Sequence, residues 1–231
     1  MIHLSEINLI IIENGMASIT SYLINELINH KIKLIFCDEK HNPVGEVMPY
    51  YGSFNTSKKI LNEIDWKKEN KKLVWQQIVK YKIHNQAMLL KKLSINGYEK
   101  LLGYENEVET DDKTNREGHA AKVYFNLLFG NEFIRGESNN INAALDYGYS
   151  ILLSAINREV TCKGYITQIG INHKNEFNQF NLSCDLIEPF RPLIDEIVYN
   201  NKSNEFNKEF KYELINVLNN KIVIDAKEQY V

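Results

Sequence analysis

The stretch GINHKNEFNQFNLSCDLIEPFRPLID, residues 170–195, guides the interpretation of the whole chain. It places His173 ahead of Asp185 and Glu188, two acidic residues three positions apart that would share one face of a helix. An imidazole with carboxylate oxygens suits Mg²⁺ or Mn²⁺, whereas a zinc site more often contains thiolates or further histidines. In the alternative interpretation, Asp185 faces water or pairs with Arg191. The stretch therefore indicates a divalent-metal site, with an ordinary polar surface as the competing explanation.

The composition is that of a folded protein with a substantial core. The 231 residues, 44% of them hydrophobic, suffice for one large domain or two small ones. No apolar run reaches the roughly 18 residues of a membrane span, and the opening MIHLSEI lacks the basic flank and cleavage site of a signal peptide. Cys37, Cys162 and Cys184 are far apart and form neither a disulfide framework nor a CxxC motif. We therefore expect a cytoplasmic protein with no membrane partner.

The net charge of −3 conceals a basic segment. Between Lys58 and Lys100 there are eleven lysines and four acidic residues. Such a face can follow a phosphate backbone, because each lysine contact releases condensed counterions. A lysine-rich helix face is more often simply solvated, and both interpretations stay open on charge alone.

The first 37 residues predict a strand, a helix and a second strand. Residues 8–12, NLIII, are a continuous apolar run, residues 16–31 carry apolar side chains at helical spacing, and residues 33–37, KLIFC, return to strand character. The turn at residues 13–15, Glu-Asn-Gly, has no glycine-rich loop and no phosphate-binding lysine. We therefore exclude nucleotide-cofactor binding at this turn.

Further segments complete the expected fold. The opening residues 2–7 alternate apolar and polar positions like another strand, and residues 44–55, rich in glycine, proline and aromatic residues, are typical of a connector. The later segments have helical patterns. We predict an α+β fold with an incomplete β-rich N-terminal domain and connector over residues 1–52 and a larger all-α domain over residues 53–231.

Two helices matter for the site. A long one is expected where apolar residues recur every three or four positions between Trp75 and Leu93. The next runs from Thr114 to Gly130 and opens with Thr114-x-x-Glu117, the spacing of a capping box. On this pattern alone, the Glu117 carboxylate reaches back to the cap of its own helix.

Three separated stretches, taken together, carry a resemblance to a known family. They are NREGHAAKVYFNLLFG at 115–130, INAALDYGYSILLS at 141–154 and QIGINHKNEFNQFNLSCDLIEPFRPLID at 168–195. In this order they resemble the CRISPR-associated integrase that captures new spacers, the family numbered first among the Cas proteins. The likeness extends upstream through IHLSEINLIIIE, KLIFCDE and MPYYG. The sequence of these motifs is most similar to the branch of the family found in type II systems.

The resemblance implies a metal-dependent DNA endonuclease and integrase with a small β-domain and a helical catalytic domain. It implies that Glu117, His173 and Glu188 hold Mg²⁺ or Mn²⁺ and carry catalysis. Asp185 takes the position of a second acidic residue outside the ligand set. The resemblance favours the ligand role of Glu117 over its capping role. It also makes Arg116, Arg191 and the lysine-rich long helix candidates for DNA contact.

The resemblance also implies partners: double-stranded DNA with 3′ ends, namely the prespacer and the CRISPR repeat, a homodimer through the β-domain, and the small second adaptation protein. Relatives usually carry extra strands before and extra helix after the residues present here, so we expect shortened ends and a weakened dimer. Two other hypotheses remain at this point. One is a truncated, non-catalytic DNA-binding or assembly subunit, and the other is a mobile-element integrase of the same fold.

Overall fold

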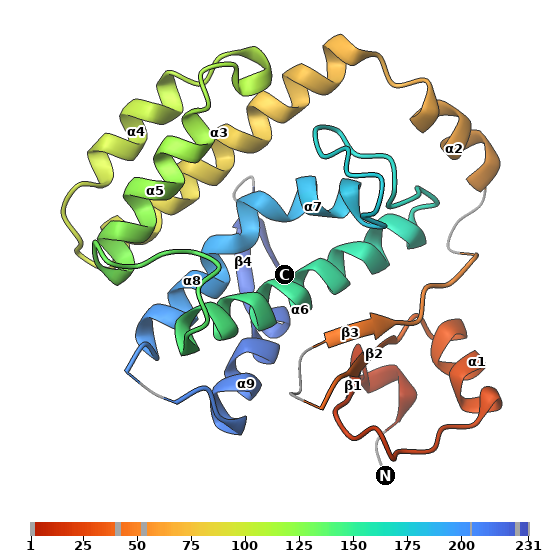
Figure 1. The fold of residues 1–231 in the computed structure, drawn as a ribbon. Helices are drawn as coiled ribbons and strands as arrows, with labels where there is room; N and C mark the ends of the chain where they lie inside the picture. Colours follow the sequence, from red (N-terminus) through yellow and green to blue (C-terminus); the bar gives the residue numbers. More distant parts are fainter. Residues whose placement is uncertain (1–2, 40–42, 52–54, 204, 225–226, 231) are drawn as a thin grey trace.

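The structure, a computed structural model, describes residues 3–39, 43–51, 55–203, 205–224 and 227–230. A small sheet with one helix lies at the N-terminal end, and most of the remaining chain is helical (Figure 1). The predicted α+β class is confirmed. The predicted domain boundary between residues 52 and 53 lies outside the described residues and stays a prediction.

The N-terminal sheet has the strand order β1-β2-β3. Strands β1 (Leu9–Ile12) and β2 (Lys33–Cys37) run parallel, and α1 (Ser21–Asn29) forms the crossover, so the predicted strand, helix and strand are confirmed. Strands buried on both faces are expected to be continuously apolar. Accordingly, Leu34 packs in the cluster that includes α1, whereas its neighbour Ile35 packs in a cluster of the helical region.

One N-terminal prediction is wrong, and one segment contains a strand that the sequence did not predict. The opening residues form a short 3₁₀ helix, η1 (Leu4–Glu6), instead of a strand, because the His3 ring accepts from the backbone N–H of Ser5 and closes a local turn. The expected connector includes a strand, β3 (Pro43–Glu46), which pairs antiparallel with β2. Proline is tolerated at the first position of an edge strand, where its missing N–H is not needed.

The helical region contains α2 (Thr56–Ile64), α3 (Lys68–Lys92), α4 (Tyr98–Asn106), α5 (Arg116–Phe129), α6 (Asn140–Cys162), α7 (Asn181–Ile187), α8 (Arg191–Asn200) and α9 (Lys208–Ile215). Short 3₁₀ turns η2 (Thr110–Asp112), η3 (Glu188–Phe190) and η4 (Asn216–Asn219) join or extend them. The predicted long helix and the helix ending before Gly130 are confirmed.

Two apolar clusters hold these helices together. Helices α4 and α5 pack on α3, whose Val79, Ile83 and Leu90 are fully buried. Helices α8 and α9 pack on α6 around a second cluster (Figure 1). Helix α7 contacts both α3 and α6, and the turn η3 contacts α3. Leu182 belongs to the first cluster and Ile187 and Ile194 to the second, so the segment 170–195 lies where the two clusters meet.

A buried polar joint connects the sheet to α6. The Glu46 carboxylate on β3 pairs with Lys33 of β2 at 2.6 Å and accepts hydrogen bonds from Ser154 and, at 3.0 Å, from Asn157. Lys33 is almost fully buried, and its burial lowers its pKa against the opposing effect of Glu46. The joint therefore depends on every charge being paired.

The C-terminal end differs from the expectation that the later segments are all helical. After α9 and η4, strands β4 (Lys221–Ile224) and β5 (Lys227–Tyr230) form an antiparallel hairpin. In the part of the chain that the structure describes, no helix is both long and apolar enough to cross a membrane.

Candidate metal centre

A lysine, Lys82, stands at the centre of the candidate site. Its side chain is 11% exposed, and its Nζ lies 2.7 Å from Oε1 of Glu117 and 2.5 Å from Oε2 of Glu188. Helix α3 supplies the lysine, the first turn of α5 supplies Glu117, and η3 supplies Glu188. Burial alone would lower the pKa of Lys82, but the charges of Glu188 and Glu117 outweigh it and the pKa is raised. Two of the predicted ligands therefore bracket one positive charge.

The start of α5 directs Glu117 toward Lys82 and away from its own helix cap. The carboxylate of Asp112 takes the capping role, accepting from the backbone N–H groups of Arg116 at 2.8 Å and Glu117 at 3.0 Å. The N-cap residue itself, Asn115, has a left-handed backbone with φ of 52° and no side-chain cap bond. The capping-box interpretation of Glu117 is wrong, because its carboxylate pairs with Lys82.

Glu188 is buried and held by two cations. Its Oε1 accepts from Nε of Arg191 at 3.0 Å and lies 2.9 Å from another guanidinium nitrogen. Its Oε2 has no aligned hydrogen bond within the described residues, although the Lys82 ammonium is 2.5 Å away. Burial would raise the pKa of Glu188, but Lys82 and Arg191 outweigh burial and the pKa is lowered. An ionised, buried oxygen held by charge without a directed hydrogen bond is suited to bind a cation.

Asp185 is fully buried and shapes the loop that carries His173. Its Oδ2 accepts from the backbone N–H of Ile171 at 2.6 Å and of Asn172 at 3.0 Å, and its Oδ1 accepts from that of His173 at 3.1 Å. The loop also requires Gly170, since a Cβ there would lie 2.3 Å from the carbonyl oxygen of His173. Asp185 therefore fixes the backbone of the loop that carries His173.

The ring of His173 is oriented by the same carboxylate. Its Nδ1 lies 2.6 Å from Oδ1 of Asp185, and because an ionised carboxylate only accepts, Nδ1 is the donor. This hydrogen bond raises the pKa of His173, with burial acting against it. In the neutral ring the lone pair is then on Nε2, the arrangement found in many histidine metal ligands.

The three predicted ligands are gathered only in part. Among the residues that the structure describes, no three His, Cys, Asp or Glu side chains lie close enough together to hold a metal ion. Glu117 and Glu188 share the Lys82 ammonium, and His173 is near enough for both carboxylates to raise its pKa. The donor set still fits Mg²⁺ or Mn²⁺, because two carboxylates already surround a buried positive charge. The fit requires that Lys82 give up its place between them.

Both arginines predicted to contact DNA make internal ion pairs. Arg116 lies 3.0 Å from Glu107, and Arg191 pairs with Glu188 and stacks over the Tyr149 ring at 4.5 Å. Each arginine side chain is 28% exposed, so part of each guanidinium still reaches the surface. Two lysines of the basic segment also have partners within the chain: Lys71 donates to the carbonyl oxygen of Gly170, and Lys92 pairs with Glu196.

Sequence reasoning did not single out Lys82. The available signal was its position on α3, three residues after Val79 and four before Gln86, both of which are buried. A lysine on the buried face of a helix needs a charged partner, since burying an unpaired ammonium is very costly. Lys82 could have been marked as a site residue on that ground, without knowledge of its partners.

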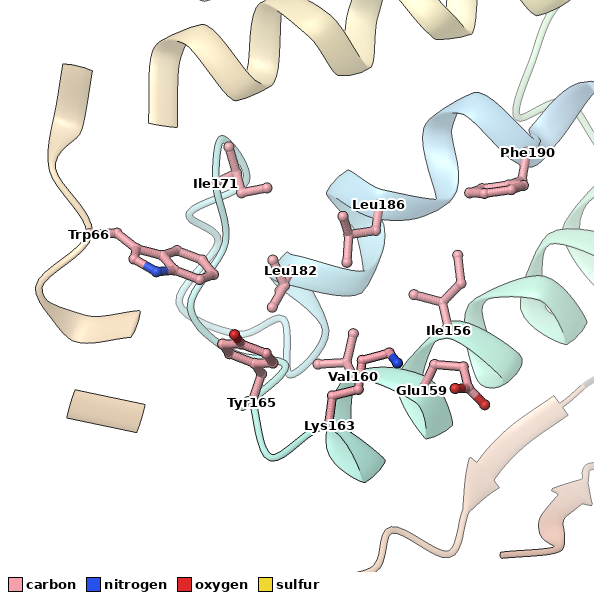
Figure 2. Close-up of a pocket in the computed structure, with 10 residues that line it drawn as sticks. All are labelled: Trp66, Ile156, Glu159, Val160, Lys163, Tyr165, Ile171, Leu182, Leu186 and Phe190. Carbon is pink, nitrogen blue, oxygen red and sulfur yellow. The ribbon is translucent and has the colours of Figure 1, made fainter. Parts of the chain in front are cut away.

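An apolar pocket of about 390 Å³ lies beside α7 (Figure 2). Leu182 and Leu186 of α7 line it together with Trp66, Tyr165 and other apolar residues. Helix α7 thus contributes Asp185 to the His173 loop and two leucines to the pocket.

Comparisons with known proteins agree on the family. The sequence profile of the family described as CRISPR associated protein Cas1 matches residues 1–224. The CRISPR-associated endonuclease Cas1 of Neisseria meningitidis is 40% identical over 194 residues, an alignment that covers 83% of this chain and 64% of the relative. The chain thus spans just under two thirds of that relative.

Two solved structures share the fold. A casposase bound to integration product superposes with a TM-score of 0.80 at 22% identity, covering 96% of this chain and 74% of that one. A chain of a Cas6-RT-Cas1–Cas2 complex has a TM-score of 0.65 at 23% identity, covering 87% of this chain and 24% of that one. On the match over residues 1–224, this chain belongs to the family of CRISPR-associated protein Cas1.

Proposed function

We propose that the chain is a metal-dependent DNA endonuclease and integrase of CRISPR adaptation. In this role it joins the 3′-hydroxyl ends of a prespacer to the repeat of a CRISPR array by transesterification. The observation that carries the proposal is the pair of Glu188, which is buried, and Glu117, which is partly exposed, around one positive charge, beside an imidazole oriented by Asp185. Its setting in a chain of the Cas1 family supports the choice of reaction.

The residues divide the work between binding and orientation. When bound, Mg²⁺ or Mn²⁺ would orient the phosphate and stabilise the charge that develops on the attacking and leaving oxygens of an in-line displacement. Glu117, Glu188 and Nε2 of His173 would hold the cation. Asp185 keeps the proton on Nδ1 of His173, and Arg191 holds the far oxygen of Glu188, so both ligands are oriented before substrate arrives.

The proposed substrates and partners rest on the same assignment. They are double-stranded DNA with 3′ ends, a second copy of the chain, and the small second adaptation protein. The last is supported by the structural similarity to a chain of a Cas6-RT-Cas1–Cas2 complex. The exposed parts of Arg116 and Arg191 are the proposed DNA contacts. Work on such DNA would place the protein in the cytoplasm.

A second candidate is a DNA-binding or assembly subunit without catalysis. It is favoured by the ligand arrangement, because no three-residue metal cluster is present among the described residues and Lys82 fills the space between the carboxylates. An integrase of a mobile element is a related possibility, favoured by the fold shared with a casposase. These candidates differ in strand transfer and in target DNA.

Strand transfer tests the proposal. Purified chain, the small adaptation protein, Mn²⁺ or Mg²⁺, end-labelled prespacer and a repeat-bearing plasmid are combined, and joined product is measured on a gel. We expect joining at the repeat, loss of at least about 100-fold in Glu117→Ala and in His173→Ala, and no loss in Glu209→Gln, an exposed control on α9.

Each other outcome has a distinct meaning. Full activity in either ligand variant refutes the ligand assignment. Salt-dependent DNA binding with no joining in any metal supports the non-catalytic subunit. With a transposon end supplied as a competing donor, joining of that end in preference to the prespacer supports the mobile-element enzyme.

A further inference from the structure

The arrangement around Lys82 is that of a cation site already filled by the protein itself. Its ammonium lies 2.7 Å from one carboxylate oxygen and 2.5 Å from another, and these oxygens come from α5 and η3. Charged lysines are rarely buried unless they are paired. Together with Arg191, which pairs with Glu188, Lys82 balances the two carboxylates, so two positive charges face two negative ones.

The other contacts of the two glutamates show which groups are free to change partner. Arg191 holds Oε1 of Glu188 with two nitrogens and stacks on Tyr149, so this oxygen has a fixed partner. Oε2 of Glu188 faces Lys82 with no aligned hydrogen bond within the described residues. Oε1 of Glu117 is hydrogen-bonded to the same ammonium. The two oxygens that a divalent cation would bind are those that Lys82 now holds.

We propose that Lys82 is an internal stand-in for the divalent cation, holding Glu117 and Glu188 in position without metal and withdrawing when metal binds. This inference rests on the proposed function, because it takes the two glutamates as metal ligands. It makes Lys82 a positioning residue with two opposite effects. It prevents the carboxylates from repelling each other, and it competes with the metal.

The physical reason is the cost of leaving buried charges unpaired. Two neighbouring carboxylates with no cation between them repel, and Glu188, which is buried, would lose one of its partners. Removing one partner of a buried ion pair is strongly destabilising. The lysine stem is long and flexible, so its head can move while α3 keeps its place. Since the metal binds only the state from which Lys82 has withdrawn, the apparent affinity is reduced by the fraction of molecules in that state.

Lys82→Met tests the proposal, because methionine keeps much of the stem and removes the charge. Binding of Mn²⁺ to the full chain is measured by titration calorimetry, and the melting temperature is measured with EDTA and with Mn²⁺. We expect K82M to bind Mn²⁺ at least about tenfold more tightly than the unchanged protein. We also expect its melting temperature to fall in EDTA and to rise with Mn²⁺ by more than that of the unchanged protein.

Two further variants keep the test decisive. Lys92→Met removes a lysine of the same helix that pairs with Glu196 at 2.5 Å in a largely exposed setting, and it should leave Mn²⁺ affinity unchanged. Lys82→Arg keeps the positive charge and adds donors, so it should weaken Mn²⁺ binding relative to the unchanged protein. If K82M is unfolded in all conditions, the affinity of K82R decides, and an affinity equal to that of the unchanged protein overturns the proposal.

The failures can be told apart. Equal Mn²⁺ affinity in K82M and the unchanged protein overturns the stand-in role alone, and the proposed integrase is unaffected. Loss of Mn²⁺ binding in K82M overturns it as well, since Lys82 would then support the metal. If neither protein binds Mn²⁺, the metal assignment of the proposed function falls together with this inference.

Discussion

Asp195 is a buried carboxyl that joins three helices behind the candidate metal centre. It lies on α8, and its oxygens accept from the hydroxyl groups of Tyr124 on α5, at 2.7 Å, and Tyr149 on α6. Burial raises the pKa of Asp195 from 3.8 to about 6, with the two tyrosines acting in the opposite direction. Because Tyr149 also stacks with Arg191, the network supports the residue that holds Glu188.

This pKa predicts a pH-dependent stability. The folded state binds a proton at Asp195 more tightly than the unfolded chain, so protonation stabilises the fold as the pH drops from about 6 to about 4. A shift of about two pKa units corresponds to roughly 3 kcal/mol. Asparagine cannot titrate, so the unchanged protein should gain stability relative to Asp195→Asn over this range, as measured by urea unfolding at pH 4 and pH 7.

A matched control isolates the effect. Asp146→Asn removes an exposed carboxylate on α6 that pairs with Arg135 at the surface, and its stability relative to the unchanged protein should change little with pH. If the difference between the unchanged protein and D195N is the same at both pH values, the raised pKa of Asp195 is wrong.

Sequence predicts residue types at the site better than their contacts. The imidazole and carboxylates of residues 170–195 stand out in the sequence, and the resemblance added Glu117. The four interactions of Asp185 with one loop could not be predicted, because they depend on how that loop folds back on α7. For the same reason nothing in the local pattern pairs Lys82 with two residues that lie 35 and 106 positions later in the chain.

At the scale of elements, the crossing of α6 and α8 is set by one glycine. A Cβ on Gly148 of α6 would lie 2.5 Å from Cγ2 of Ile194 on α8, and Ile194 is fully buried. Alanine normally gains about 1 kcal/mol over glycine in a helix. Here the contact would force the two helices apart, and overpacking typically costs about 1–3 kcal/mol.

Two glycine variants separate these effects. We expect Gly148→Ala to lower the free energy of unfolding by up to about 2 kcal/mol, the overpacking cost less the helix-propensity gain. Gly103→Ala in α4 should raise it by up to about 1 kcal/mol, since a Cβ there meets nothing within 4 Å. Chemical denaturation of both variants checks the prediction, and a stabilised Gly148→Ala would show that α6 and α8 are not closely packed.

The elements found from sequence are those with a strong repeating pattern. Trp75, Val79 and Ile83 share one face, and this spacing alone located α3. The elements missed are short and depend on partners: β3 is recognisable only beside β2, and β4 only beside β5. A four-residue strand has too few alternating positions to be recognised without its neighbour.

At the scale of the whole molecule, the orientation of the N-terminal sheet depends on the buried joint at Glu46. Glu46→Ala would leave Lys33 buried without its partner and would remove the acceptor for Ser154 and Asn157. Breaking a buried ion pair from one side typically costs about 3–5 kcal/mol. We expect hydrogen exchange in β2 and β3 to become faster, while exchange in the centre of α3 stays slow.

Glu159→Ala is the control for this prediction. Glu159 lies on the same helix α6 as Ser154 and Asn157, but it is largely exposed and pairs only with its neighbour Arg158 among the described residues. Its removal should change stability by less than about 0.5 kcal/mol. Unchanged exchange in β2 after Glu46→Ala would show that apolar packing around Ile35 holds the sheet without the joint.

Helix α3 carries two lysines that contact the segment 170–195 at separate points. Lys71 donates to the carbonyl oxygen of Gly170 at 2.8 Å, and Lys82 holds Glu188. They lie eleven residues apart, about three turns, so both side chains lie on the same side of helix α3. One residue inserted between them would rotate the second by about 100° and advance it by about 1.5 Å. Substitutions between Lys71 and Lys82 are therefore easier to tolerate than a change in the length of α3. An insertion or deletion there would break the contact with Gly170 or the contact with Glu188.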